Sequence, residues 1–281
     1  MHLRPGRPDR TGRTLRAVGA GAAALLALTA CSSSGTTSGS SADAGAGAGT
    51  SGTSAQLSGT VTVFAAASLQ ESFTALGEEF EKEHPGAKVT FNFGGSDTLA
   101  ASITGGAPAD VFAAASARTM AAVTDQEDTV GTPTTFVRNQ LEIATLPGNP
   151  DDISSLKDLT EPGLKVVLCD RTVPCGAAAQ SALEAAGLEL TPVSYEQDVK
   201  GALTKVELKE ADAAVVYRTD VRAAGDKVEG VDFPESAKVV NDYPIALLKN
   251  APNPDTAKAF IALVKSSEGR RVLTEAGFLE P

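Results

Sequence analysis

The chain has 281 residues, of which 42% are hydrophobic and 21% charged, so it carries enough apolar side chains to build a globular core. Its formal net charge of −11 argues against nucleic acid as a partner, because that partner normally needs a basic face. The charge does not exclude small anions, since exposed carboxylates are screened over about 8 Å at physiological salt.

The first thirty residues have the pattern of a secretory signal. Five arginines within the first sixteen residues precede an apolar stretch at 17–28 that is too short to span a bilayer. The stretch ends in "LTAC", which resembles the lipobox of bacterial lipoproteins, where the cysteine receives a diacylglyceryl group. We expect residues 1–30 to be removed and Cys31 to become a lipidated N-terminus. Plain secretion with an incidental cysteine is the alternative.

Residues 31–57 contain almost no large apolar side chain, so they cannot bury a core. A Gly/Ser/Ala/Thr segment of this length predicts a flexible tether that reaches about 30 Å. The folded part would then work just outside a membrane and be held there by its lipid. Without residues 1–30, which contain five arginines and one aspartate, the net charge falls from −11 to −15.

From residue 57 onward, short apolar strand patterns alternate with helical patterns. The expected elements, in chain order, are a strand at 60–65, a helix at 68–83, a strand at 88–93, a helix at 96–104, a strand at 110–115, a helix near 116–123, strands at 140–146 and 165–170, helices at 176–186 and 199–208, a strand at 213–217 and a helix at 254–275. This alternation predicts an α/β fold with mainly parallel strands.

The folded part is large for one sheet, and its pattern divides into two halves. We expect a crossover near 138–141 and a return near 238–244. The first lobe would then contain residues 58–138 and 241–281, and the second lobe residues 139–240. The final helix should pack back on the first lobe.

Two cysteines remain when Cys31 is assigned to lipidation. Cys169 and Cys175 form an even pair, close in sequence, in a chain that is expected to be exported. This predicts a disulfide, with two free thiols as the alternative. A metal site is not expected, because His84 has no cluster of ligands around it.

Small or polar residues recur where helices are expected to begin. Ser68, followed by Glu71 three residues later, fits a capping box. Ser96 follows two glycines, and Asp198 precedes a helical pattern. Each of these residues could be an ordinary cap, worth about 1 kcal/mol. Small residues at a helix start also leave its N–H groups accessible to an anion, which is the sharper alternative.

Two further positions extend this pattern. Pro174 suits the first turn of the helix expected at 176–186. Tyr217 ends the strand pattern "AAVVY", so its phenol could lie at the carboxyl end of a strand, where open α/β sheets bind ligands. The plainer alternative is a core tyrosine with a satisfied hydroxyl.

Six segments resemble, in order and spacing, the molybdate-binding proteins of ABC uptake systems: "VTVFAAASLQESF", "FGGSDTLAASITGGAPADVFAAAS", "VPCGAAAQSAL", "DVKGALTKVE", "AAVVYRTD" and "YPIALL". The resemblance covers the chain from residue 58 onward. It implies a periplasmic-binding-protein-like fold of type II, in which two α/β lobes joined by hinge strands close on a tetrahedral oxyanion.

The resemblance also implies a role for individual residues. Ser68 and Ser96 match hydroxyl donors of the first lobe. Cys175 and Val199 match positions that supply main-chain N–H groups, and Tyr217 matches a phenolic donor. Cys175 departs from the family, in which many relatives have a small residue such as alanine. A backbone role survives this change, although a bridge to Cys169 could alter the angle of the loop.

The implied function is a monomeric, non-catalytic lipoprotein that binds molybdate, and tungstate too, without a further cofactor. It would pass the oxyanion to a membrane permease powered by a cytoplasmic ATPase. The alternatives are a receptor for sulfate, phosphate or an organic acid, an enzyme, and an adhesion domain. An organic anion usually calls for an arginine clamp, which no helix start carries, although Arg171 lies in the third loop. A serine hydrolase needs a base, yet only His84 remains beyond residue 30, and "GGSDT" lacks the final glycine of a nucleophile elbow.

Overall fold

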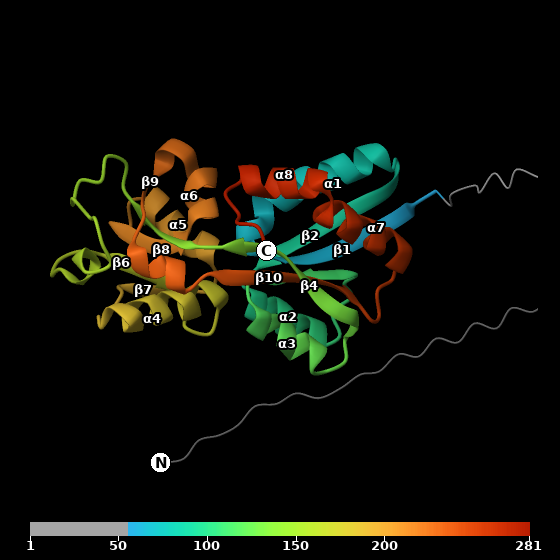
Figure 1. Cartoon of the computed structure of the whole chain (residues 1–281), viewed down its shortest axis with the longest axis horizontal. Coiled ribbons are helices and arrows are strands. Elements are labelled where there is room, and N and C mark those ends of the chain that lie inside the picture. Colours follow the sequence, from blue (N-terminus) through green and yellow to red (C-terminus); the bar gives the residue numbers. More distant parts are fainter. Residues whose placement is uncertain (1–55) are drawn as a thin grey trace, which may run out of the picture. The chain divides into compact units, whose positions relative to one another are not determined.

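The computed structural model describes residues 56–281, which form two lobes that are each built on a five-stranded sheet (Figure 1). The expected signal peptide, Cys31 and the tether up to residue 55 lie outside the described residues. No helix within the described part combines the length and the apolar character that crossing a bilayer requires.

The sheet of the first lobe has the strand order β2-β1-β3-β10-β4. Its strands are β1 (Ser58–Ala66), β2 (Gly86–Gly94), β3 (Val111–Ala113), β4 (Thr129–Asn139) and β10 (Asn241–Leu248). Its helices are α1 (Gln70–Glu83), α2 (Ser96–Thr104), α3 (Ala117–Thr124), α7 (Pro254–Lys265) and α8 (Ser267–Glu275). The first lobe therefore takes its elements from both ends of the described chain.

The sheet of the second lobe has the strand order β7-β6-β8-β5-β9. Its strands are β5 (Leu141–Thr145), β6 (Val166–Cys169), β7 (Ser194–Glu196), β8 (Ala213–Tyr217) and β9 (Glu229–Val231). Its helices are α4 (Pro174–Ala186), α5 (Val199–Glu207) and α6 (Arg218–Ala224). The chain passes between the lobes twice, from β4 into β5 and then back into β10 (Figure 1).

The α/β class is confirmed, but the sheets are mixed and not mainly parallel. In the first lobe β1 pairs in parallel with β2 and β3, whereas β10 pairs antiparallel with β3 and β4. The second lobe repeats this division, because β6 has parallel partners and β5 has antiparallel ones. Every antiparallel pair includes β5 or β10, the strands that follow the two passages of the chain between the lobes.

The helices expected at 96–104, 176–186 and 199–208 are present to within two residues at each end. Pro174 occupies the first turn of α4, and Gly187 ends that helix with a left-handed φ of 65°. The single helix expected at 254–275 is wrong. The backbone is extended at Ser266, whose hydroxyl caps the second helix by accepting the N–H of Gly269 at 3.1 Å. A strong local cap thus divides a pattern that reads as one helix.

The second half of strand β1, from Val61 onward, lies between two helical layers. Val61, Val63 and Ala65 belong to the core that α1, α7 and α8 cover, whereas Phe64 belongs to the core on the side of α2 and α3. A strand that is covered on both faces needs apolar residues in sequence and not in alternation. This burial explains the continuous apolar run that ends at Ala67, where the site begins.

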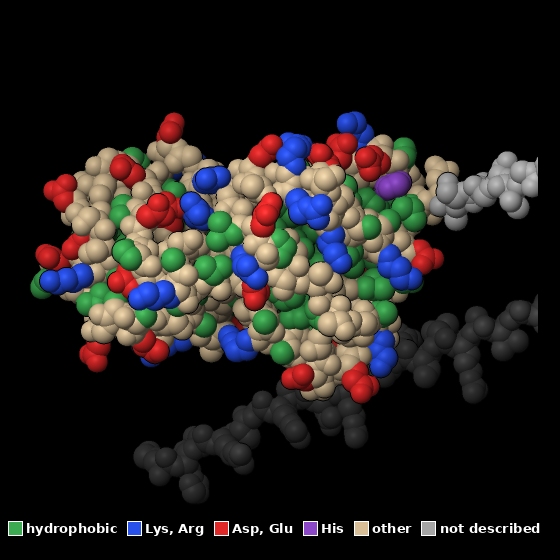
Figure 2. Space-filling model, viewed as in Figure 1, with side chains coloured by type: hydrophobic (Ala, Val, Ile, Leu, Met, Phe, Trp, Pro, Cys, Tyr) green, Lys and Arg blue, Asp and Glu red, His purple; other side chains and the backbone are tan. Residues whose placement is uncertain are grey.

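On the visible face of the described residues, acidic and basic side chains are interspersed (Figure 2). On that face the charges therefore form no broad patch of one sign.

Asp110 fastens the C-terminal segment to the first strand. Its buried carboxylate accepts the main-chain N–H of Thr62 in β1 and that of Asn253 before α7, both at 2.7 Å. Hydrogen bonds to a charged acceptor are stronger than those between neutral groups. Asp110 therefore holds together two segments that lie far apart in the chain.

We predict that Asp110→Ala lowers the free energy of unfolding by about 3 kcal/mol, because it leaves two N–H groups without their acceptor. Denaturant unfolding of the unliganded protein measures this loss. Asp226→Ala is the control, since Asp226 is exposed, and it should change stability by no more than about 0.5 kcal/mol. Equal stability of the two variants would contradict the role assigned to Asp110.

Candidate functional site

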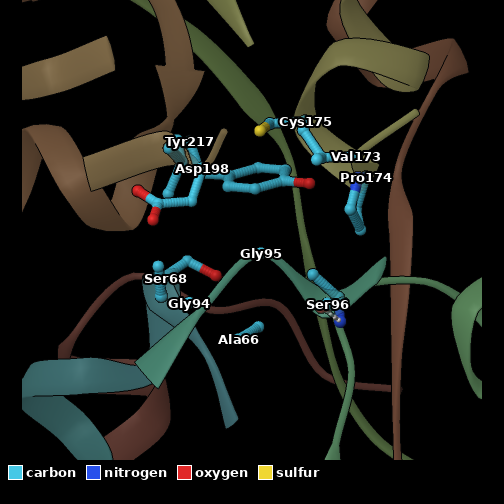
Figure 3. A pocket seen from close by; sticks show the side chains of 13 residues that line it. Ala66, Ser68, Gly94, Gly95, Ser96, Val173, Pro174, Cys175, Asp198 and Tyr217 are labelled. Carbon is cyan, nitrogen blue, oxygen red and sulfur yellow. Dashed lines mark hydrogen bonds between the residues drawn. The ribbon is translucent and has the colours of Figure 1, made fainter. Parts of the chain in front are cut away.

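A small pocket lies between the two lobes, where strands end and helices begin (Figure 3). Its volume is about 20 Å³. All five residues expected to bind a ligand line it: Ser68, Ser96, Cys175, Val199 and Tyr217. The rest of the lining is made of Ala66, Ala67, Gly94, Gly95, Ala115, Val173, Pro174 and Asp198, so the pocket wall contains no arginine, lysine or histidine.

Ser68 is buried in a short 3-10 turn, Ala67–Leu69, between β1 and α1. The expected capping box is wrong, because Leu69 is the N-cap of α1 and no side chain caps that helix. The Ser68 hydroxyl instead lies 2.8 Å from the hydroxyl of Tyr243. Ser68 therefore does not cap its own helix. Its side chain contacts Tyr243 and also lines the pocket.

Ser96 is the first residue of α2 and is 1% exposed. Its hydroxyl oxygen accepts the main-chain N–H of Ala115 at 3.0 Å. Because this bond occupies a lone pair of the oxygen, the hydroxyl hydrogen is left for another acceptor. Ser96 is thus arranged as a donor to the pocket.

The starts of α4 and α5 supply main-chain donors from the second lobe. No side chain caps α4, whose first residue, Pro174, has no N–H, so Cys175 provides the first one. In α5 the carboxylate of Asp198 accepts the N–H of Gly201 at 2.9 Å, which leaves the N–H of Val199 free of that cap. Helix starts of this kind favour negative charge through their unpaired N–H groups and their dipole.

The carboxylate of Asp198 does not oppose this arrangement. Asp198 is the N-cap of α5, as its position in the sequence indicates. Figure 3 shows its carboxylate turned away from Ser96 and Pro174. The wall that faces the pocket centre is therefore formed by uncharged groups.

Tyr217 ends β8 and is 1% exposed. Its hydroxyl is buried and has no hydrogen-bond partner among residues 56–281. Figure 3 shows the phenol extending across the pocket toward Ser96 and Pro174. Burial raises the pKa of Tyr217 well above its ordinary value, so the phenol keeps its proton and can donate it.

The start of α4 is tied tightly to the end of β6. Cys169 and Cys175 form a disulfide between these two elements. Gly176 packs so closely that an added Cβ would lie 1.9 Å from the carbonyl oxygen of Asp170. The bridge and the close packing of Gly176 hold the start of α4, and with it the main chain of Cys175, beside the end of β6.

Gly95 allows the lobes to approach each other. A Cβ at this position would lie 2.5 Å from the carbonyl oxygen of Gln197, which precedes α5 in the second lobe. Main chain therefore meets main chain across the cleft, with no room for a side chain at this point.

Tyr243 is a residue of the site that the sequence analysis missed. It lies in β10, is fully buried, and its hydroxyl contacts both Ser68 and the amide of Asn139, the latter at 3.3 Å. Asn139 also donates to Thr219 of the second lobe at 2.9 Å. The segment "YPIALL" was the available signal, but nothing in it indicates a partner 175 positions earlier.

Comparisons with known proteins agree with this geometry. The profile of the family "Bacterial extracellular solute-binding protein" matches residues 61–279. The molybdate-binding protein ModA of Mycobacterium tuberculosis is 46% identical over 222 residues, which are 79% of this chain and 85% of that protein. ModA of Escherichia coli is 34% identical over 232 residues, which are 78% of this chain and 89% of that protein.

A solved structure supports the fold. The periplasmic molybdate-binding protein of Azotobacter vinelandii superposes with a TM-score of 0.69 at 21% identity, covering 79% of this chain and 99% of that one. At 21% identity this match supports the two-lobed fold and nothing further. The family assignment depends on the ModA relatives and the family profile, which extend over most of the sequence. The chain therefore belongs to the bacterial extracellular solute-binding proteins, within the family of the ModA molybdate-binding proteins.

Proposed function

We propose that this protein captures molybdate, and tungstate as well, between its two lobes and delivers it to an ABC importer. The observation that carries the proposal is the convergence of uncharged donors from both lobes on one small pocket. Two hydroxyls come from the first lobe, and two helix starts and a phenol come from the second. The relatives named molybdate-binding proteins support the choice of ligand.

The donors suit a fully deprotonated oxyanion. A dianion that enters a dry cleft loses several kcal/mol of hydration per charge. Each charge-assisted hydrogen bond returns about 1.5–3 kcal/mol, so several donors must converge on the four oxygens. A protonated anion such as hydrogen phosphate also needs an acceptor for its proton, and the groups that face the pocket centre are arranged as donors.

The size of the pocket argues against an organic solute. Pockets for drug-sized ligands have volumes of about 300–1,000 Å³, whereas one water needs about 10–15 Å³. A volume of about 20 Å³ leaves room only for a compact solute. The lining also lacks the arginine clamp that a carboxylate ligand usually meets.

We further propose that the protein is a non-catalytic, monomeric lipoprotein on the outer face of the cell membrane. Lipidated Cys31 would be its anchor and the segment up to residue 57 its tether. The partner would be a membrane permease with a cytoplasmic ATPase. The lipobox-like "LTAC" supports the anchor, and membership of the extracellular solute-binding proteins supports the location.

A panel of oxyanions tests the ligand. Molybdate and tungstate should each raise the melting temperature, because a ligand at 100 times its Kd adds about 2.7 kcal/mol of stability. Sulfate and phosphate at the same concentration should have little effect. A response to sulfate alone would replace the proposal with a sulfate receptor.

We predict that Ser68→Ala weakens molybdate binding at least about tenfold, because it removes one charge-assisted hydrogen bond. Ser72→Ala is the matched control. Ser72 is also buried, lies at the start of α1 and is absent from the pocket lining. Calorimetry on both variants should show a loss for Ser68 only, and unchanged affinity of Ser68→Ala would refute its assignment as a donor.

Tyr217→Phe and Tyr243→Phe should change stability and affinity in different ways. The Tyr217 hydroxyl has no partner among the described residues, so its removal should leave the unliganded protein as stable or more stable, while affinity falls at least about fivefold. Removal of the Tyr243 hydroxyl breaks its contacts with Ser68 and Asn139 and should cost about 1 kcal/mol without ligand. Unfolding and calorimetry measure both effects, and a Tyr217→Phe variant with normal affinity would contradict a donor role.

A further inference from the structure

Lys200 makes an ion pair that joins the two lobes. It is the second residue of α5, and its ammonium lies 2.8 Å and 2.9 Å from the two carboxylate oxygens of Glu71, in α1 of the first lobe. Each other ion pair found among residues 56–281 links groups of the same lobe. The Lys200 side chain is 21% exposed, so solvent screens this pair less than a surface pair.

Lys200 also reaches into its own lobe. Its ammonium lies 3.3 Å from the Oδ1 atom of Asp220, a fully buried residue of α6. The other carboxylate oxygen of Asp220 accepts the main-chain N–H of Tyr217 at 3.2 Å. Lys200 is therefore connected to the strand end that carries the phenol of the site.

The charges of this cluster fit a bridging role. Burial raises the pKa of Asp220 to about 6, and the ammonium of Lys200 opposes that rise. Burial disfavours the ammonium of Lys200, but its pairing with Asp220 and Glu71 outweighs this effect and raises the pKa. Lys200 consequently stays charged at neutral pH. Lys200 does not line the pocket of the proposed site. Its ammonium instead pairs with the carboxylates of Glu71 and Asp220.

We propose that Lys200 is a positioning residue that locks the closed lobes around the bound oxyanion. It follows Val199 directly, and through Asp220 it is tied to the main chain of Tyr217, so one ammonium is connected to both of these donors of the second lobe. Its pair with Glu71 holds them against the first lobe. The inference rests on the proposed function, because it concerns the same site.

The proposal predicts an effect on ligand release. A contact between lobes is made only when the lobes meet, so its loss should speed opening and leave capture by the open form largely unchanged. Loss of a close charge pair in an interface typically raises the dissociation rate.

Glu71→Gln is the informative variant, because it breaks the contact between the lobes and leaves Lys200 paired with Asp220. Glu210→Gln is a matched control. Glu210 follows α5 and pairs at 2.6 Å with Lys205 of that helix, within one lobe, and its side chain is 52% exposed against 50% for Glu71. The two substitutions therefore remove the same charge at nearly equal exposure.

Stopped-flow tyrosine fluorescence with molybdate gives both rate constants. The chain has no tryptophan and three tyrosines, of which Tyr217 lines the pocket. Glu71→Gln should raise the dissociation rate at least about fivefold and change the association rate less than about twofold, while Glu210→Gln changes neither rate. Without molybdate, the two variants should melt at the same temperature.

A double substitution shows whether Lys200 is the partner. If Glu71 acts through Lys200, then Glu71→Gln combined with Lys200→Met should release molybdate no faster than Lys200→Met alone. Equal dissociation rates for Glu71→Gln and Glu210→Gln would overturn the inference, and so would additive effects in the double variant. A wild-type protein that binds neither molybdate nor tungstate would overturn the proposed function itself, which is a distinguishable outcome.

Discussion

Hydrogen bonding of a doubly negative ion away from water is the interaction on which the rest of this structure depends. Each oxygen of such an ion must find donors, since its lost hydration costs several kcal/mol per charge. One helix start or one hydroxyl returns only a part of that cost. In the site that we propose, the donors are therefore divided between two lobes, with Ser68 and Ser96 on one side and Cys175, Val199 and Tyr217 on the other.

The fold serves this division through close main-chain packing. Gly95 lets the first lobe meet the backbone before α5, and Gly176 sets the start of α4 against the end of β6. The Cys169–Cys175 disulfide holds that same helix start. Behind the pocket, Tyr243 on the returning strand β10 orients Ser68. The pocket residues are thus positioned by contacts between segments that lie far apart in the chain. The ion pair of Lys200 with Glu71 is a further contact of this kind between the lobes.

The sequence predicts most of the helices and strands because their signals are local. Asp198 caps α5 as expected, since caps act within one turn. The error at Ser68 occurs where a distant contact overrides a local pattern. Ser68 fits a capping box with Glu71, yet its hydroxyl contacts Tyr243, and Glu71 pairs with Lys200. The break at Ser266 has a local cause, because its hydroxyl caps the second of two helices in a pattern that reads as one long helix.

By itself the sequence determined the α/β class, the helix starts with small residues and the resemblance that marks five positions of the site. The class and the helix starts depend on periodicity and spacing, which are properties of neighbouring residues, and the five positions depend on the resemblance to the family. Only the tertiary structure decided that the five positions surround one pocket, that Tyr217 keeps a hydroxyl without a protein partner, and that Lys200 bridges the lobes. These depend on residues far apart in the chain, such as Glu71 and Lys200, which are 129 positions apart, and no local pattern records which distant segments will meet.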